Sequence, residues 1–474
     1  MRAYTVVSGL VLVLCALAVG CGGAAETTAG IPESASLAPA DAVAYITLVT
    51  DEGSAQWEKA DDLLQVFPTA REQLLESLQR ELSDEGLTWE DDIAPALGPE
   101  VVVVVTAGKR PVALTKPDDD AKLTALLESS DEEFVQGEVD GWTAVAERQA
   151  DLDAYRAALG RGSLETDRRF TVAMNALPDE ALGRAWADLS TLTRDLDELL
   201  EQSGTSLDLG LDWIAGAVSA EDDGVLTTMG IHTPSGTGAT QYEPVLFARV
   251  PADAVGALSF GGTQGVLDRL QDRVDLDEVS KQIEEAVGIS LDGVIGALSG
   301  EGVLYVRDSG ASFPELTLVL SPPDPAGAWK TVDTLVRKIA EGLDAPVTAG
   351  SEGGVAVSKL VTEQLTVTYA RLDDDTVIVT TGTNAVATFR GGGAKLADSD
   401  GFKSAAERVE LGERTNGFVY VDIDGMIPFA EGLAGADSIP AEAREVVERI
   451  DSFILQAKDD GETTRVSGFI RIDR

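Results

Sequence analysis

The chain has 474 residues, of which 82 are acidic and 36 are basic, and its formal net charge is −46. This charge argues against a nucleic-acid binder, because such a protein needs cationic surface to displace the counterions of the phosphate backbone. One histidine and two cysteines are too few for a histidine-rich metal site or a disulfide framework, which leaves calcium or magnesium held by oxygen ligands. The hydrophobic fraction of 44% is that of a folded globular protein. The length of the chain predicts about two or three domains.

The N-terminus has the pattern of a bacterial lipoprotein signal. Arg2 precedes an apolar stretch, Val6–Val19, that is shorter than the about 20 residues of a membrane-spanning helix. Cys21 follows, and the residues after it are small or polar, as expected of a flexible tether. We therefore predict a signal peptide over residues 1–20, a lipid on Cys21 and a tether over residues 21–36.

The lipoprotein pattern has one departure. Ala18 stands three residues before Cys21, where such signals usually have Leu, Val or Ile. An ordinary secretory signal cleaved nearby, or an uncleaved anchor, is the alternative. With a lipid on Cys21 the protein is expected at the outer face of the bacterial cytoplasmic membrane. Its acidic body would be repelled by an anionic membrane surface, so attachment would depend on the lipid.

The remaining chain contains two stretches that resemble each other in order. Pro39–Val43 has the same five residue types as Pro251–Val255. Each copy is followed by a charged helical stretch, a short helix ending in Ala-Leu, and a valine-rich strand, which is Glu100–Thr106 in the first case and Glu301–Arg307 in the second. We predict two diverged copies of one unit, over residues 37–233 and 246–474, joined by a linker over residues 234–245.

Each unit is predicted to be α+β, a largely antiparallel sheet with covering helices, because the strands lie beside their hairpin partners along the chain. The apolar run Val101–Val105 predicts a central strand covered on both faces. Leucine spacing over Trp57–Leu82 predicts two helices separated at Pro68. The turn residues Asp222–Gly224 and Asp459–Gly461 predict a hairpin at the end of each unit.

These features together resemble a known family. The lipoprotein-like start, Leu-Ala-Pro-Ala-Asp at Leu37–Asp41 and Ala-Leu-Gly-Pro-Glu at Ala96–Glu100 are similar to a family of bacterial secreted and lipid-anchored proteins of unknown function, DUF3352. The motifs mark turns and strand starts, and none is a catalytic signature. The resemblance implies an extracytoplasmic envelope protein and brings no activity, cofactor or site residue with it.

Signatures of nucleophilic catalysis and phosphate binding are missing from the sequence. It has no Gly-x-Ser-x-Gly elbow, and a Ser-His-Asp triad would have to use His232, which we interpret as an edge-strand residue beside the linker. No Walker A loop is present, and the glycine clusters at residues 261–265 and 391–393 are interpreted as loops.

Acidic residues are abundant, but no pair of them is distinctive. Trp89–Asp92 places an aromatic residue beside acids, as a sugar site would, although a tryptophan anchor with helix-capping acids is the simpler interpretation. Four aspartate clusters suggest fragments of calcium loops, but none completes an EF-hand. They are Asp118–Asp120, Asp373–Asp375, Asp398–Gly401 and Asp422–Gly425. We assign no catalytic residue, metal ligand or cofactor.

Two classes of function remain. The first is a non-enzymatic binding or scaffold module of the cell envelope with an unknown protein partner or, in its sharper form, a carrier of an amphiphilic ligand between sheet and helices. The alternative is a carboxylate-dependent envelope hydrolase, assisted by calcium.

Overall fold

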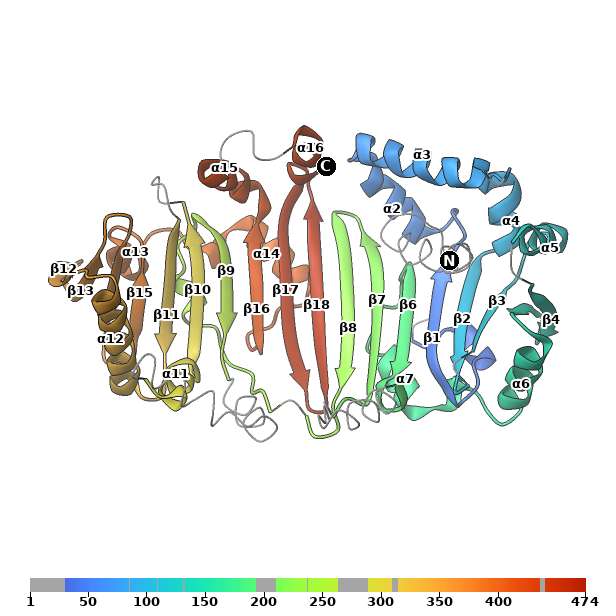
Figure 1. Cartoon of the computed structure of the whole chain (residues 1–474), viewed down its shortest axis with the longest axis horizontal. Helices are drawn as coiled ribbons and strands as arrows, with labels where there is room; N and C mark the ends of the chain where they lie inside the picture. The colour runs from blue at the N-terminus through green and yellow to red at the C-terminus, as the bar shows by residue number, and fades with distance from the viewer. Residues whose placement is uncertain are drawn as a thin grey trace. The chain divides into compact units, whose positions relative to one another are not determined.

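The computed structural model describes residues 30–84, 86–108, 110–130, 133–192, 210–236, 238–262, 289–308, 314–434 and 440–474 (Figure 1). The chain divides into two compact units between Pro234 and Ser235. The predicted signal peptide and Cys21 lie outside the described residues. No helix in the described ranges is long and apolar enough to cross a membrane.

The first unit contains an antiparallel sheet with the strand order β8-β7-β6-β1-β2-β3-β5-β4. Its elements in chain order are η2 (Glu33–Leu37), β1 (Ala42–Val49), α2 (Ala55–Gln65), α3 (Pro68–Asp84), η3 (Trp89–Ile93), α4 (Ala94–Leu97), β2 (Glu100–Thr106), β3 (Pro111–Thr115), α5 (Asp120–Ser129), β4 (Val135–Val139), β5 (Trp142–Ala146), α6 (Gln149–Leu159), η4 (Leu164–Thr166), α7 (Arg168–Met174), β6 (Gly183–Asp188), β7 (Trp213–Glu221) and β8 (Gly224–His232).

The second unit contains an antiparallel sheet with the strand order β18-β17-β16-β9-β10-β11-β15-β14-β13-β12. Its elements are η5 (Phe247–Arg249), β9 (Ala254–Phe260), α11 (Leu291–Leu298), β10 (Glu301–Arg307), β11 (Glu315–Ser321), α12 (Pro325–Gly342), β12 (Val347–Glu352), β13 (Val355–Val361), β14 (Thr366–Arg371), β15 (Val377–Thr380), α13 (Ala385–Arg390), η6 (Leu396–Asp398), α14 (Asp400–Arg408), β16 (Gly417–Asp422), α15 (Ile423–Ala434), α16 (Ala441–Val447), β17 (Ile450–Asp460) and β18 (Thr463–Ile472).

The strand order of the first unit recurs in the second, where β9 takes the place of β1 and the hairpin β12–β13 is added. Both first strands have an irregular register at their start, at Val43 in β1 and Val255 in β9. A proline precedes each irregularity and forms an isolated antiparallel bridge. Pro39 pairs with Ser163, directly before η4, and Pro251 pairs with Lys395, directly before η6. The two sheets are therefore built in the same order from their own separate segments.

Local sequence signals explain several of these elements. The predicted strand Glu100–Thr106 is β2 as observed, and Glu301–Arg307 is β10. Pro68 begins α3, because its ring cannot occupy the interior of a continuous helix. Both predicted closing hairpins are present, β7–β8 and β17–β18. The predicted mixed α/β architecture with antiparallel sheets is therefore confirmed.

One face of the first sheet is covered by η2, α6, η4 and α7 and carries the main core of this unit. Phe170 from α7 packs edge-on against Tyr45 and Trp186, with ring centroids 5.2 and 5.6 Å apart. All three side chains are almost completely buried. Aromatic rings prefer such edge-to-face contacts over face-to-face stacking, which fixes α7 on the sheet.

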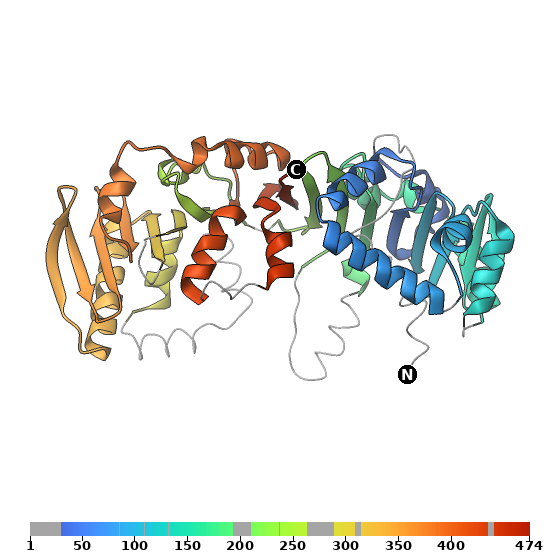
Figure 2. The same ribbon diagram turned by 90° about the horizontal axis from the view of Figure 1, so that it is seen from above.

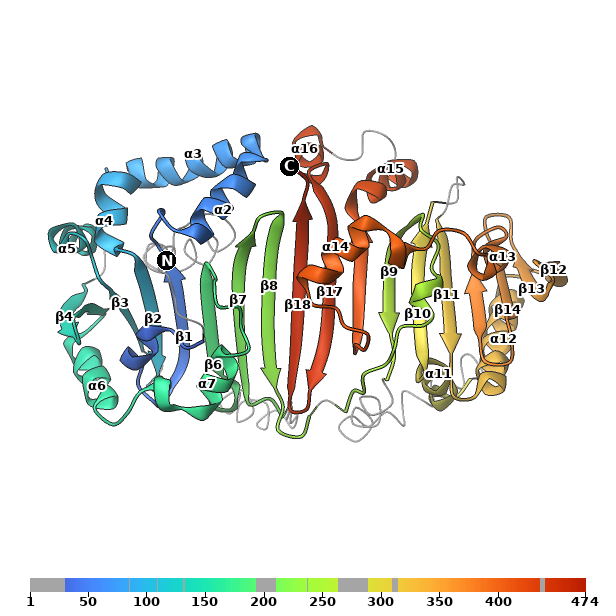
Figure 3. The same cartoon turned by 180° about the vertical axis from the view of Figure 1, so that it is seen from behind.

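The corresponding face of the second sheet is covered by η5 and α14. Phe247 and Phe418 lie 4.7 Å apart between ring centroids, and Phe402 of α14 contacts Tyr420 at 5.3 Å. Figure 3 shows α14 in front of the strands of this unit, and Figure 2 shows α14 and α15 on opposite sides of the sheet. We call the face of the sheet that lies under η5 and α14 the covered face of the second unit.

Two predicted boundaries are wrong. The tether was expected to reach residue 36, but Ser34 and Ala35 are buried, because the Ser34 hydroxyl bonds to Tyr45 and to the Glu100 carboxylate. The linker was expected to reach residue 245, but Tyr242 exchanges backbone hydrogen bonds with Thr415 in the second unit. In both cases composition predicted flexibility, whereas long-range hydrogen bonds hold the segment on the sheet.

Candidate functional site

The face of the second sheet opposite the covered face carries only glycine and hydrophobic residues in three central rows over six neighbouring strands, with the pair Asp459 and Thr464 beyond them at the end of β17 and β18. Residues that pair across a ladder point to the same side of a sheet, so the register identifies this face. Its three rows run from β18 to β11. They are Gly468, Leu455, Val419, Leu258, Leu304 and Leu318; Ile470, Phe453, Val421, Gly256, Val306 and Leu316; and Val466, Ala457, Gly417, Phe260, Gly302 and Leu320. We call these residues the open face.

The open face is incompletely buried. Leu258, Leu316, Leu455 and Ile470 have between 37% and 43% of their surface exposed. Figure 1 shows the strands β9, β10, β11, β16 and β17 without a described helix across their middle. Large side chains on four strands thus form an exposed apolar surface, which in a soluble domain usually marks an interaction site.

The covered face of the same sheet is the more polar one. Thr317 and Thr380 share a hydrogen bond of 2.7 Å there, and the Arg307 guanidinium donates to Glu315 at 3.1 Å. Glu315 is almost fully buried. Polar groups that are buried need partners, and these pairs provide them. A sheet with one solvated side usually has its polar residues on the exposed face. In the second unit the polar residues lie on the covered face, and the three rows of the open face are apolar.

The equivalent face of the first unit has smaller side chains. Its central row contains Gly216 and Ala185 where the second unit has Leu455 and Val419. Helix α2 covers part of this sheet, and the Gln56 side chain makes hydrogen bonds of 3.1 and 2.8 Å to the backbone of Ala220. The large exposed apolar surface is therefore a property of the second unit.

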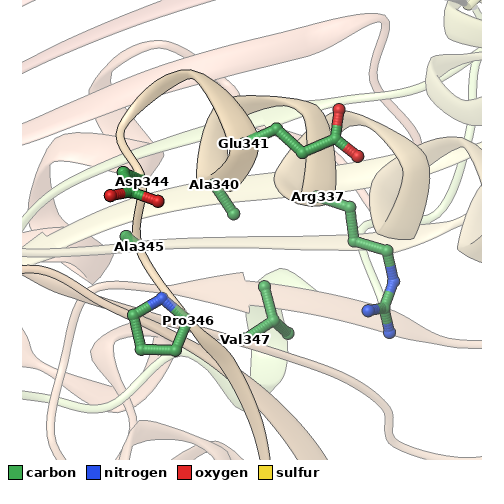
Figure 4. A pocket seen from close by; sticks show the side chains of 7 residues that line it. All are labelled: Arg337, Ala340, Glu341, Asp344, Ala345, Pro346 and Val347. Carbon is green, nitrogen blue, oxygen red and sulfur yellow. The ribbon is translucent and has the colours of Figure 1, made fainter.

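A pocket of about 520 Å³ lies beside α12, between the end of this helix and the start of β12. Figure 4 shows the helix residues along one side and Pro346 and Val347 along the other. Its lining residues are Arg337, Ala340, Glu341, Asp344, Ala345, Pro346 and Val347. The lining contains no serine, cysteine or histidine, and its two carboxylates are those of Glu341 and Asp344.

The predicted acidic motifs serve as helix caps and turns. Asp92 accepts the Thr88 backbone N–H at 2.9 Å, and the ammonium of Lys122 at 2.8 Å lowers its pKa. Asp119 caps α5, and Asp422 accepts the Gly425 N–H at 2.9 Å at the start of α15. Burial raises the pKa of Asp422. Such caps satisfy the free N–H groups at a helix start.

The other aspartate clusters also lie in local turns. Asp373 accepts the Asp375 N–H at 3.1 Å, and Asp398 lies 3.9 Å from the Lys403 ammonium. Within the described ranges, no three His, Cys, Asp or Glu side chains converge on a point where they could hold a metal ion. The structure therefore brings none of the predicted calcium motifs together.

His232 ends β8 and belongs to an ion-pair network. Its Nδ1 lies 3.1 Å from the Asp212 carboxylate, and its ring stacks on Trp213 at 5.2 Å. Arg169 donates to Asp212 and to Asp188, each at 3.2 Å. Asp212 thus connects the imidazole to Arg169 and, through it, to Asp188, an arrangement that orders the ends of β6, β7 and β8.

The open face escaped the sequence analysis. Strands β9, β10 and β11 carry hydrophobic residues at both alternate positions, a pattern that predicts strands buried on both sides. Only the register of the strands and the placement of the helices separate the covered residues from the exposed ones. The β12–β13 hairpin was also missed, although Gly353-Gly354 between two alternating segments is a hairpin signal.

Fold and surface together define an α+β protein built on antiparallel sheets, with an exposed apolar sheet face on its second unit. The sequence matches the family described as "Protein of unknown function (DUF3352)" over residues 152–472, more than half of the chain. The chain therefore belongs to the DUF3352 family. The motifs at Leu37–Asp41 and Ala96–Glu100 lie before the matched range, so the match rests on other residues.

No curated protein matches the chain. Among solved structures, crystal form III of TP0453 is similar with 10% identity and a TM-score of 0.25, covering 48% of this chain and 93% of that chain. Crystal form I of TP0453 has 11% identity and a TM-score of 0.24, covering 45% and 83% of the two chains. Likeness at this level carries no argument about fold details or function.

Proposed function

We propose that this protein is a lipid-anchored, extracytoplasmic binding module of the bacterial cell envelope, and that the open face of its second unit holds the apolar part of an amphiphilic molecule. One observation supports this function: the three rows of the open face are apolar over six strands, yet Leu258, Leu316, Leu455 and Ile470 remain exposed. Covering an exposed leucine or isoleucine of this face would contribute roughly 1 kcal/mol.

The charge of the protein restricts the head group of such a ligand. A net charge of −46 repels anionic molecules at long range and favours neutral or cationic ones. We therefore expect a neutral or cationic amphiphile to bind more tightly than an anionic one with the same chain. The difference should shrink as salt is added, because ions screen the interaction.

A binding titration tests this proposal. A fluorescent alkyl amine is titrated against the full chain, and against a double variant with Leu258→Gln and Leu455→Gln. We expect the double variant to bind at least about tenfold more weakly, since polar groups would face the alkyl chain. The variant Val172→Gln is the control, because Val172 is an exposed hydrophobic residue of α7 in the first unit. Equal binding by all three proteins would refute the proposal.

The membrane anchor has its own test. Cells that produce the wild type or Cys21→Ala are fed a labelled fatty acid, and the protein is isolated from membrane and soluble fractions. Label and membrane association should both be lost in the variant. Equal labelling of the two proteins would contradict lipidation at Cys21.

We also propose that the two units are diverged copies of one ancestral unit. The repeated strand order, the irregularities at Val43 and Val255 and the bridges of Pro39 and Pro251 support this origin. A sequence profile built from relatives of the first unit should recognise the second unit better than shuffled sequences of the same composition. Failure to do so would favour independent origins.

A further inference from the structure

The strand β12 offers a free edge. Among the described strands it pairs only with β13, and the hairpin closes at Glu352 and Val355 around Gly353-Gly354. At the other end the Val361 N–H donates to Pro346 O at 3.2 Å. In an antiparallel pair, every second residue directs its backbone N–H and C=O to the partner strand. The backbone groups of Val347, Ala349 and Ser351 therefore point away from β13.

Most side chains of β12 do not protect this edge. The one charged residue of the strand, the buried Glu352 beside the hairpin turn, is paired with Lys359 at 2.8 Å. Natural edge strands are usually protected by lysine, inward-pointing charges, bulges or proline within the strand. Residues Thr348, Ala349, Gly350 and Ser351 are small, uncharged and exposed, and the register with β13 runs without a bulge. Another extended chain could therefore approach the backbone of β12 closely.

An acidic side chain lies where this edge begins. Asp344 lines the pocket between α12 and β12, and it has a positive φ of 51° at the end of the helix. Glycine is the residue that favours this conformation, so an aspartate at this position costs some stability. Asp344 makes no ion pair within the described part of the chain. Arg337 is paired with Asp333 at 2.9 Å and Lys338 with Glu341 at 3.2 Å, which leaves Asp344 as the uncompensated charge.

We propose that β12 binds an extended, basic peptide segment by strand addition, with a lysine or arginine of the segment in the pocket beside Asp344. Backbone hydrogen bonds to Val347, Ala349 and Ser351 would hold the segment, and the pocket would select its side chain. The net charge of −46 favours a cationic partner and disfavours a second copy of this chain. This site is separate from the open face and does not depend on its function.

Fluorescence anisotropy with synthetic peptides tests the proposal. The probe is a labelled peptide of alternating valine and threonine with one lysine, added to the full chain. Two comparison peptides have glutamate in place of lysine, or N-methyl groups on alternate backbone amides. We expect the lysine peptide to bind, the glutamate peptide to bind at least about tenfold more weakly, and the N-methylated peptide not to bind.

Two variants connect the binding to the residues. Asp344→Asn removes the charge and keeps a residue that tolerates positive φ, so it should fold normally and bind the lysine peptide about tenfold more weakly. Ala349→Pro removes an outward N–H without touching the ladder to β13, and should abolish binding. Asp375→Asn is the control, since this exposed aspartate lies in the turn between β14 and β15 and does not line the pocket.

Several results would overturn the proposal. They are no binding of the lysine peptide, equal binding of the N-methylated peptide, or binding unchanged by Ala349→Pro in a variant whose melting curve matches the wild type. Formation of dimers that Ala349→Pro abolishes, seen by sedimentation, would assign the edge to a second copy and would also refute the basic peptide as its occupant.

Discussion

Glu301 holds the turn that leads into the central strand of the second unit, because its carboxylate accepts the backbone N–H of Leu246 at 2.5 Å. The corresponding carboxylate of the first unit, Glu100, accepts the Ser34 hydroxyl at 2.9 Å and also bonds to Thr47. Burial raises the pKa of both groups, and that of Glu301 to about 7. The same position thus fixes the start of the sheet in each unit with a partly buried acid.

The raised pKa of Glu301 makes stability depend on pH. The folded protein binds the proton more tightly than the unfolded chain, so this group stabilises the fold fully below about pH 4.5 and loses its contribution as pH rises to about 7. Glu301→Gln should remove this dependence and stabilise the second unit by about 1 kcal/mol at pH 8, after allowance for solvent screening. Urea denaturation at pH 5 and pH 8 measures the difference. Glu363→Gln, at an exposed turn position, is the control, and equal pH profiles for wild type and Glu301→Gln would contradict the prediction.

Gln56 should be important for the first unit. Its amide satisfies both backbone groups of Ala220, which is completely buried. Gln56→Ala leaves a buried N–H and C=O without partners, and we expect a loss of about 2 to 3 kcal/mol in the free energy of unfolding. Gln65→Ala removes an exposed hydrogen bond to Asp61 and should cost less than about 0.5 kcal/mol. Similar urea midpoints for the two variants would disprove this role.

Gly98 is required by a close backbone contact. It has a positive φ of 61°, and a Cβ atom there would lie 1.8 Å from Lys116 O. Gly98→Ala should cost more than about 3 kcal/mol or prevent folding, because the backbone would have to shift to relieve the overlap. Gly86 has a φ of 73° and no atom within 4 Å of such a Cβ, so Gly86→Ala isolates the backbone cost of about 1 kcal/mol. Thermal melts measure both, and equal losses would show that the contact is unimportant.

The two faces of the second sheet should respond differently to truncation. Phe418→Ala on the covered face removes a buried ring in contact with Phe247, and about 3 to 5 kcal/mol should be lost. Leu258→Ala on the open face removes a side chain that is 38% exposed, and about 1 kcal/mol should be lost. Denaturant titration of both variants without ligand gives the comparison. A loss at Leu258 as large as that at Phe418 would mean that the open face is packed in solution.

The sequence alone determined much of the local structure. Valine runs set the bounds of β2 and β10, Pro68 separated α2 from α3, and Asp-Gly turns marked the closing hairpins. These features depend on interactions over a few residues, such as side-chain alternation, proline sterics and turn conformation. The caps formed by Asp119 and Asp422 follow from the same local chemistry.

Tertiary structure decided which of these residues form the candidate sites. Leu258 and Val303 are both hydrophobic strand residues, yet one is exposed and the other fully buried, because helices cover only one side of the sheet at that point. Among the described residues, the outward backbone of Ala349 and the charge of Asp344 have no partner, and this likewise depends on which strand lies at the edge and on where α12 ends. Exposure and edge position result from contacts between residues far apart in the chain, so periodicity along one segment carries no information about them.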